Sequence, residues 1–323
     1  MERFEYASPA TLKEATALLG SSWSDAQVLA GGTDLISLMK EYLVSPKRVV
    51  NIKSIGELGG ISKTGAGVRI GATVTFDELS AHPLMRDYPS LVTAALGVAS
   101  PQIRNMGTVG GDLCQRPRCW YYRGGYGLLA MKDGKSLVPD GENRYHAIFG
   151  GGPAYFVSPS SLGPALVALG AQVKLVSPSG SRTVGVDQFF VIPKSDTERE
   201  TAIQSDEILT EILIPAARTK NATYEVRHKD ALDWPLATAS VALKMNGSKV
   251  GSARVVLGHV APTPWPAAAA EKALAGKSID EATAEEAAAI AVDGAQPLSQ
   301  NGYKVQLAKV AVKRALLEAA GKA

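Results

Sequence analysis

Two short segments of the sequence have the composition of phosphate-binding loops: "AGGTDL" (30–35) and "GTVGGDL" (107–113). Each places a Gly-Gly pair beside a threonine and an aspartate, after an apolar stretch. Glycine lets the backbone approach a ligand closely and adopt a positive φ, and successive N–H groups in such turns can surround an anion. Two loops of this kind could hold the two phosphates of a dinucleotide. The same residues also fit two unrelated tight turns, and the pattern alone does not choose between them.

The remaining residues show little arrangement for catalysis. There is no GxGxxG stretch of the kind that binds nicotinamide dinucleotides. The segment "EKALAGKS" (271–278) lacks the first glycine of a P-loop and lies in a helical pattern. The four histidines are scattered, without a carboxylate or cysteine at ligand spacing. We therefore predict no catalytic side chains and no metal site, so that the chemistry comes from a bound cofactor or the protein is not catalytic.

Composition and charge argue against several classes of protein. The 323 residues carry a net charge of +3 without any concentration of Lys and Arg, so we expect no nucleic-acid surface. No apolar run approaches the roughly 20 residues of a membrane span, and the N-terminal segment lacks the apolar core of a signal peptide. Two cysteines are typical of a reducing compartment. We expect a cytoplasmic protein, which a signal on a partner could still export as part of a folded complex.

The first glycine segment lies in an expected strand–turn–helix unit. A helix is predicted at 11–19, followed by a short apolar strand at 26–30. Residues 33–43 are predicted as a helix capped by Thr33 or Asp34, and residues 48–52 as a second strand. This succession is typical of a small βαβ-like unit with a glycine turn after its first strand.

The second glycine segment follows a different pattern. A strand at 68–72, a helical turn at 76–81 and an alanine-rich helix at 89–99 precede it. Residues 115–149 are rich in Arg, Tyr and Gly and have little periodicity, which indicates an insertion, an interface or a functional loop. A helix at 162–169 and a strand at 172–177 are predicted next.

The last third of the chain changes from strands to helices. Residues 236–245 and 250–260 are predicted as long strands joined in a hairpin at Asn246-Gly247. Three alanine-rich helices are predicted after the hairpin, at 265–274, 280–292 and 303–320. Strands followed by helices indicate a separate α+β domain that begins near residue 217.

Four segments occur in the order seen in a known family: "LAGGTDLISLMK", "IGATVTFDEL", "ASPQIRNMGTVGGDL" and "PSSLGPALVALGAQV". Together with "LDWPLATASVALKM" and "VVLGHVAPTPWPA", they resemble the FAD-binding medium subunits of the molybdenum hydroxylase, or xanthine dehydrogenase, family. The resemblance covers nearly the whole chain. Within the family, "QRPRCWYYR" and "GENRYHAIFGGGPAYFV" are most similar to FAD subunits of bacterial aldehyde dehydrogenases of the xanthine type.

The resemblance implies an α+β fold. It has a two-part FAD-binding domain of the vanillyl-alcohol-oxidase (p-cresol methylhydroxylase) type and a C-terminal α+β domain with an antiparallel sheet and helices. The expected divisions are 1–55 and 56–216 for the FAD-binding domain, with an insertion near 115–150, and 217–323 for the C-terminal domain. Carried over position by position, the cofactor-binding residues are Val28, Leu29, Ala30, Gly31, Gly32, Thr33, Asp34, Leu35, Gly107, Thr108, Gly110, Gly111, Asp112, Ser161, Leu209 and Arg227, with Lys229 as the alternative to the last.

Two of these positions depart from the family pattern. Asp112 stands where an asparagine is usual. A carboxylate beside a pyrophosphate must face away, accept hydrogen bonds or weaken binding. Ser161 stands where an acidic residue normally contacts the cofactor.

The resemblance implies a subunit that carries electrons and does not touch the organic substrate. It would join a molybdopterin-binding large subunit and a small [2Fe–2S] subunit in a heterotrimer, and FAD would pass electrons from the iron–sulfur subunit to an external acceptor. A stand-alone flavoprotein oxidase or reductase is an alternative that requires its own base beside the flavin. A flavin-free scaffold is a second alternative, which Asp112 and Ser161 make conceivable.

Iron content gives the first testable prediction. The most similar subgroup binds a [4Fe–4S] cluster in the insertion through four cysteines. Here the insertion keeps Cys119, and the other expected positions hold residues such as Leu128, Ser136 or Leu137, and Ala154. Such a cluster requires about four thiolates, and Cys114 and Cys119 are the two cysteines of the chain, so we expect no cluster. An iron assay on the purified chain checks this, and about four irons per chain would overturn it.

Overall fold

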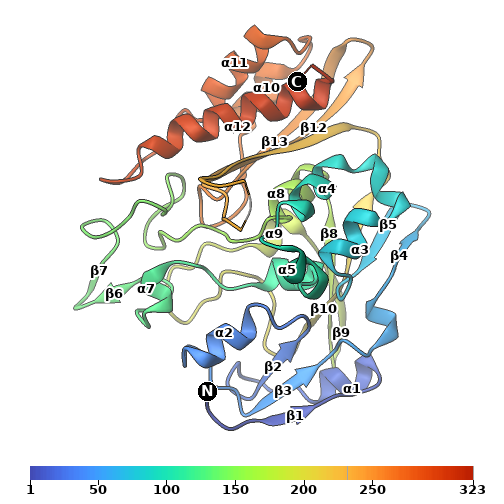
Figure 1. Cartoon of the computed structure of the whole chain (residues 1–323), viewed down its shortest axis with the longest axis vertical. Coiled ribbons are helices and arrows are strands. Elements are labelled where there is room, and N and C mark those ends of the chain that lie inside the picture. Colours follow the sequence, from blue (N-terminus) through green and yellow to red (C-terminus); the bar gives the residue numbers. More distant parts are fainter. Residues whose placement is uncertain (231, 323) are drawn as a thin grey trace.

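The computed structural model describes residues 1–230 and 232–322, which form an α+β fold with three main sheets (Figure 1). A small N-terminal sheet lies at the bottom of Figure 1, a five-stranded sheet in the middle and a four-stranded sheet with the C-terminal helices at the top. The predicted α+β class is confirmed. Each sheet lies within one of the predicted segments, and the segment boundaries themselves stay a prediction.

The N-terminal sheet has three parallel strands in the order β1-β3-β2. Its elements are β1 (Glu5–Ala7), α1 (Leu12–Ala17), β2 (Ala26–Leu29), α2 (Leu35–Lys40) and β3 (Arg48–Asn51). Thr11 begins α1 with a capping box, in which its side chain and that of Glu14 each bond the other's backbone N–H. Because β2 and β3 pair in parallel across α2, the βαβ-like unit is confirmed. The first glycine segment therefore lies at the C-terminal edge of this sheet.

The middle sheet is antiparallel, in the order β4-β5-β10-β8-β9. Its strands are β4 (Ile61–Lys63), β5 (Gly67–Gly71), β8 (Gln172–Ser177), β9 (Gly180–Gly185) and β10 (Ile208–Pro215). The accompanying helices are η1 (Gly56–Leu58), α3 (Phe76–Ala81), η2 (Pro83–Asp87), α4 (Pro89–Leu96), α5 (Pro101–Met106), α6 (Val109–Cys114), α8 (Gly163–Ala168) and α9 (Val186–Phe189). One continuous core joins the sheet to these helices, as Ile70, Leu91, Leu166 and Ile212 illustrate.

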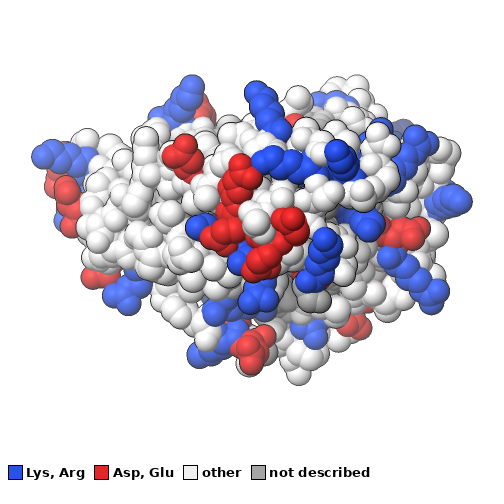
Figure 2. Space-filling model, turned by 90° about the horizontal axis from the view of Figure 1, so that it is seen from above, with Lys and Arg blue, Asp and Glu red and all other residues white. Residues whose placement is uncertain are grey.

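The C-terminal sheet is covered by helices from two parts of the chain. Its elements are β11 (Lys220–Val226), β12 (Ala237–Asn246), β13 (Lys249–Gly258), β14 (Trp265–Pro266), α10 (Ala268–Leu274), α11 (Glu281–Ala291) and α12 (Tyr303–Ala320). In Figure 1, α12 runs above β12 and β13, whereas α8 and α4 lie below them and contact β13 and β11. The predicted hairpin is confirmed: Asn246 pairs with Lys249, and Gly247 has a φ of 61°. Figure 2 shows basic and acidic side chains interspersed on the face above this domain.

The insertion has little regular structure of its own. It contains α7 (Trp120–Arg123) and a hairpin of two short strands, β6 (Met131–Lys132) and β7 (Lys135–Ser136). Its far end is bonded to the start of α12. The buried Asn301 amide donates to the carbonyls of His146 (3.1 Å) and Ala147 (3.2 Å). The buried Lys304 ammonium donates to the carbonyls of His146 (3.2 Å) and His259 (2.6 Å), so the C-terminal domain fixes the insertion in place.

Several sequence predictions need correction. The helix predicted at 33–43 is limited to α2, and α4 ends at Leu96, after which Ser100 caps a separate α5. The helix predicted to begin at residue 265 begins at Ala268, because the two residues at 265–266 form β14. The second glycine segment is not a loop: most of it is α6, because Val109 and Leu113 are buried in the core and their packing outweighs the poor helix propensity of glycine.

The Asn301 contacts lead to a stability prediction. Asn301→Ala removes the two bonds to the insertion and the bond that the side chain accepts from the Leu298 N–H (2.6 Å). The His146 carbonyl keeps its bond from Lys304, but the Ala147 carbonyl and the Leu298 N–H lose the Asn301 side chain. Leaving a buried partner unpaired costs about 1–3 kcal/mol, so we expect a melting temperature several degrees lower by calorimetry. Asn105→Ala is the matched control, because the Asn105 side chain is exposed and bonds only the local Pro101 carbonyl. Equal shifts in the two variants would contradict the predicted role of Asn301.

Candidate functional site

A cavity of about 380 Å³ lies where the N-terminal unit, the helices of the middle sheet and the C-terminal domain meet. The predicted positions that line it are Val28, Ala30, Gly31, Gly32, Thr33, Asp34, Leu35, Gly107, Thr108, Gly110, Gly111, Asp112, Ser161 and Leu209. The structure thus gathers residues that are more than 170 positions apart in the sequence around one space.

Leu29 and Arg227 do not line the cavity. The Leu29 side chain packs beneath Gly32, where its Cδ1 lies 3.1 Å from the position that a Cβ on Gly32 would take. Arg227 is half-buried, forms an ion pair with Glu225, and its guanidinium lies directly against Gly97, which lines the cavity. Lys229, the alternative to Arg227, is exposed and its backbone N–H bonds Asp233. Binding of the cofactor by Arg227 or Lys229 stays a prediction.

The first glycine segment offers free backbone donors to the cavity. No hydrogen bond within the described residues occupies the N–H groups of Gly31, Gly32 and Thr33. Gly32 has a φ of 75°, which favours glycine at this position. The Ala30 carbonyl is held by the Lys53 ammonium at 3.1 Å. Consecutive free N–H groups in a turn form a concavity suited to an anion.

The second glycine segment contributes in another way. Thr108 caps α6 by accepting a hydrogen bond from the Gly111 N–H (3.1 Å). The N–H groups of Val109 and Gly110 donate to the carbonyls of Val74 and Ala72. Most backbone N–H groups of the second segment are therefore bonded within the protein, unlike those of the first, and its part in cofactor binding stays a prediction.

The two segments touch through glycine. A Cβ on Gly31 would lie 2.0 Å from the Met106 carbonyl oxygen and 3.0 Å from the Gly107 Cα. A Cβ on Gly110 would lie 2.8 Å from the Ala72 Cβ. Both contacts require glycine, since the first joins the two segments and the second seats α6 on the end of β5. The close approach, and not only ligand access, explains why these residues are glycines.

The Asp112 carboxylate accepts hydrogen bonds from the protein, which is one of the three possibilities expected for an acidic residue at this position. Asp112 is buried, and its carboxylate accepts hydrogen bonds from the Ser160 hydroxyl (2.5 Å), the Ser161 N–H (3.2 Å), the Leu162 N–H (3.0 Å) and the Gln115 amide (3.0 Å). Burial outweighs these bonds and raises the pKa of Asp112 to about 6. The carboxylate thus links α6 to the turn that carries Ser161, and its charge is taken up by protein donors.

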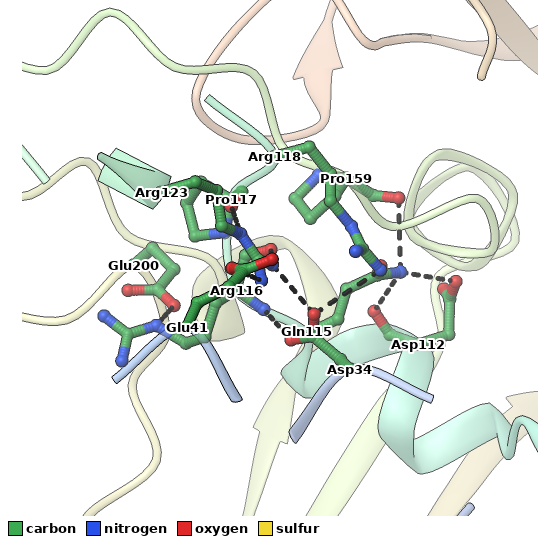
Figure 3. Close-up of polar contacts among 10 residues, drawn as sticks. All are labelled: Asp34, Glu41, Asp112, Gln115, Arg116, Pro117, Arg118, Arg123, Pro159 and Glu200. Atoms are coloured by element: carbon green, nitrogen blue, oxygen red, sulfur yellow. Dashed lines mark hydrogen bonds and ion pairs between the residues drawn. The ribbon is translucent and has the colours of Figure 1, made fainter. Parts of the chain in front are cut away.

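Asp34 has a different role from the predicted one (Figure 3). It precedes α2, but its side chain makes no capping hydrogen bond, and Thr33 does not cap the helix either. The Asp34 carboxylate instead accepts from the Arg116 N–H and from the Arg123 guanidinium, both at 2.8 Å, and lies 3.4 Å from the Arg118 guanidinium. The insertion is therefore bound to the first glycine segment by one carboxylate.

Several arginines and tryptophans of the cavity are not predicted from the sequence. Arg116 pairs with the buried Glu200, and the Arg118 guanidinium lies 4.8 Å from the centre of the Trp234 ring. The Arg199 guanidinium lies 4.0 Å from the centre of the Trp23 ring. The arginine-rich "QRPR" stretch was a signal for a functional segment, but its partners are too far away in sequence to be identified by spacing.

Cys119 lies beside His146 in the insertion, with 3.1 Å between its Sγ and the imidazole Nε2. Burial raises the pKa of the Cys119 thiol and lowers the pKa of His146 to about 4, so the pair is neutral at physiological pH. The described residues contain no group of three or more His, Cys, Asp and Glu that could hold a metal ion. The prediction that this chain lacks a [4Fe–4S] cluster continues to rest on its two cysteines.

Comparison with protein families agrees with this site. The family described as "FAD binding domain in molybdopterin dehydrogenase" matches residues 2–217, and "CO dehydrogenase flavoprotein C-terminal domain" matches residues 222–319. The chain belongs to the FAD-binding subunits of the molybdenum hydroxylase family. It is accordingly an oxidoreductase subunit with an FAD-binding domain, as the sequence predicted.

Similar proteins come from several enzymes of this family. The chain is 32% identical over 321 residues to the carbon monoxide dehydrogenase medium chain of Hydrogenophaga pseudoflava, covering 97% of this chain and 96% of that one. It is 32% identical over 337 residues to the aldehyde oxidoreductase FAD-binding subunit of Escherichia coli, covering 100% of both. The equal identities do not single out a subgroup, so membership of the aldehyde dehydrogenase subgroup stays a prediction.

Solved structures share the fold over the full length. The H. pseudoflava carbon monoxide dehydrogenase has a chain that superposes with a TM-score of 0.77 at 32% identity, covering 99% of this chain and 98% of that one. A chain of quinoline 2-oxidoreductase from Pseudomonas putida superposes with a TM-score of 0.79 at 27% identity and the same coverage.

The pKa of Asp112 predicts how stability depends on pH. Because the folded-state pKa is raised to about 6, above that of the unfolded chain, the folded protein binds this proton more tightly. The stabilisation is fully present below roughly pH 4 and is lost as the pH rises through about 6. Relative to Asp112→Asn, the free energy of unfolding of the natural protein should therefore fall by roughly 3 kcal/mol across this range. Urea unfolding of both proteins at a series of pH values measures the difference, and parallel curves would refute the assignment.

Proposed function

We propose that this chain binds FAD in the cavity and transfers electrons within a heterotrimeric molybdenum-containing oxidoreductase. It accepts them from a small [2Fe–2S] subunit and passes them to an external acceptor, while a molybdopterin-binding large subunit oxidises an aldehyde, xanthine or another N-heterocycle. The observation that carries the proposal is the group of three free N–H donors of Gly31, Gly32 and Thr33 at the cavity wall. This group suits the pyrophosphate of a dinucleotide.

The residues present fit FAD in specific ways. The Gly31–Thr33 turn would bind the pyrophosphate, with the Thr108 hydroxyl free to donate from the opposite segment because its oxygen accepts from Gly111. Asp112 would position Ser161 for contact with the cofactor, because its carboxylate accepts a hydrogen bond from the Ser161 N–H at 3.2 Å. Apolar parts of the cavity wall are formed by Val28, Leu35 and Leu209. Bound FAD exchanges either one or two electrons, which suits a junction between a one-electron relay and a two-electron acceptor.

The carboxylates of the cavity favour electron transfer over a stand-alone oxidase or reductase. Such an enzyme needs a base that is free to reach its substrate. Asp34 is bound to arginines and Asp112 to the 160–162 turn. Glu207 pairs with Arg182 at 2.6 Å, and Asp233 accepts the backbone N–H groups of its own loop. Within the described lining residues, each carboxylate is thus engaged by the protein.

The remaining features agree with a subunit of a larger enzyme. The relatives belong to a carbon monoxide dehydrogenase, an aldehyde oxidoreductase and a quinoline 2-oxidoreductase, which supports the proposal that the organic substrate is chosen on another polypeptide. Among the described residues there is no helix that combines the length and the apolar character needed to cross a membrane. We place the complex in the cytoplasm because both cysteines are free thiols, as a reducing compartment allows.

Flavin content tests the proposal. We expect the purified chain to show the visible absorption of bound flavin and to copurify with two partner subunits when all three are coexpressed. Gly31→Ala should lose most of the flavin, because its Cβ would push the two glycine segments apart. Gly56→Ala is the matched control, since no atom lies within 4 Å of its Cβ position. A colourless natural protein that takes up no added FAD would refute the proposal and favour a flavin-free scaffold. Flavin without partner subunits would favour a stand-alone flavoprotein.

A further inference from the structure

Trp23 and Arg199 form a stacked pair in the wall of the cavity. Trp23 comes shortly before β2, and Arg199 lies in the segment between α9 and β10. The guanidinium carbon lies 4.0 Å from the centre of the indole ring. The pair therefore brings together a flat cation and a flat aromatic ring from two parts of the chain, on a surface that a ligand can reach.

The bonds of Arg199 to the protein are few for a buried guanidinium. Its nearest carboxylate is Glu200, at 4.0 Å, and this carboxylate also pairs with Arg116 at a shorter distance. Its Nε is buried, and no hydrogen bond within the described residues occupies it. Burial lowers the pKa of Arg199 to about 10, so it remains charged at neutral pH. An arginine with five donors and so few partners has N–H groups left for a ligand.

The position of the pair relative to the first glycine segment suggests what it binds. Trp23 precedes β2 and Gly31 follows it, and a strand of four residues spans about 13 Å. Gln27 and Val28 of this strand also line the cavity. The Gln27 side chain donates to the Trp23 carbonyl at 2.8 Å, which holds Trp23 to the strand. The cavity therefore continues along β2, away from the turn that would bind the pyrophosphate.

The other part of the cavity is suited to the flavin. Leu232 and Trp234, from the C-terminal domain, line it and are 72% and 42% exposed. A redox group that exchanges electrons with other proteins must lie near the surface, so the flavin belongs at this open side. The remaining half of the dinucleotide, its adenosine, is then directed along β2 toward Trp23.

We propose that Trp23 and Arg199 form the subsite for the adenine base of FAD and set the preference of this chain for FAD over FMN. This inference rests on the proposed function. The flat base would stack on the Trp23 ring beside the guanidinium and accept in-plane hydrogen bonds through its ring nitrogens from the free Arg199 donors. Stacking of a nucleobase on such a side chain contributes about 1–3 kcal/mol, and a guanidinium strengthens it.

The test compares two flavins on the full-length protein after its flavin has been removed. FMN lacks the adenosine portion of FAD, so it does not use the proposed subsite. We expect Trp23→Ala to weaken FAD binding by about tenfold or more and to leave FMN binding unchanged, in titrations followed by flavin fluorescence. Arg199→Lys, which keeps the charge but loses the planar group, should act in the same direction. ADP should compete with FAD for the natural protein and compete less well for Trp23→Ala.

Controls separate this inference from the proposed function. Trp120→Ala removes a tryptophan outside the cavity and should leave both affinities unchanged. Unchanged FMN binding shows that the variants are folded, and Trp23→Phe, which keeps an aromatic ring, should retain most of the FAD affinity. Unchanged FAD binding by Trp23→Ala, or equal losses for FAD and FMN, would overturn the adenine subsite but not the proposed function. A natural protein that binds neither flavin would refute both the adenine subsite and the proposed function.

Discussion

The contact between Gly31 and the backbone of Met106 and Gly107 is the constraint on which the site depends. No side chain fits between these segments, because a Cβ on Gly31 would overlap the Met106 carbonyl. The N-terminal parallel sheet and the helices of the middle sheet can therefore approach closely enough to enclose a cavity between them. The free N–H groups of the first segment then face that cavity, while the second segment supplies the surface against which the first is held.

Electrostatics of the cavity follow from the same arrangement. Acidic side chains surround a site that is proposed to hold a pyrophosphate, which would be unfavourable if they were free. Each is bound by donors of the protein: Asp34 by arginines of the insertion, and Asp112 by a hydroxyl and backbone N–H groups. These carboxylates hold together the segments that form the wall. Their negative charge is therefore compensated by these protein donors and repels a bound pyrophosphate less.

The sequence predicted the elements that have strong local signals. The βαβ-like unit, the hairpin at Gly247 and the long helix α12 are recognisable because periodicity and turn residues are local properties. It could not predict that the second glycine segment is helical, because burial of Val109 and Leu113 decides this and depends on residues far along the chain. For the same reason Asp34 was interpreted as a helix cap, although its arginine partners lie more than 80 positions away. Family motifs identified the glycine segments of the cavity wall, whereas Trp23 and Arg199 have no motif and required the structure.

The anchoring of the insertion to α12 affects the order in which the protein can be assembled. Asn301 and Lys304 contact residues about 155 positions earlier, so these bonds form only after almost the whole chain has been synthesised. Contacts between such distant residues are reached late and slow folding. Arg116 and Arg118, at the other end of the insertion, line the cavity. The cavity end of the insertion is held by Asp34 and Glu200 of the N-terminal domain, whereas its far end is fixed only once α12 has been synthesised. The insertion thus links the wall of the cavity to the last helix of the chain, although the two lie in different domains.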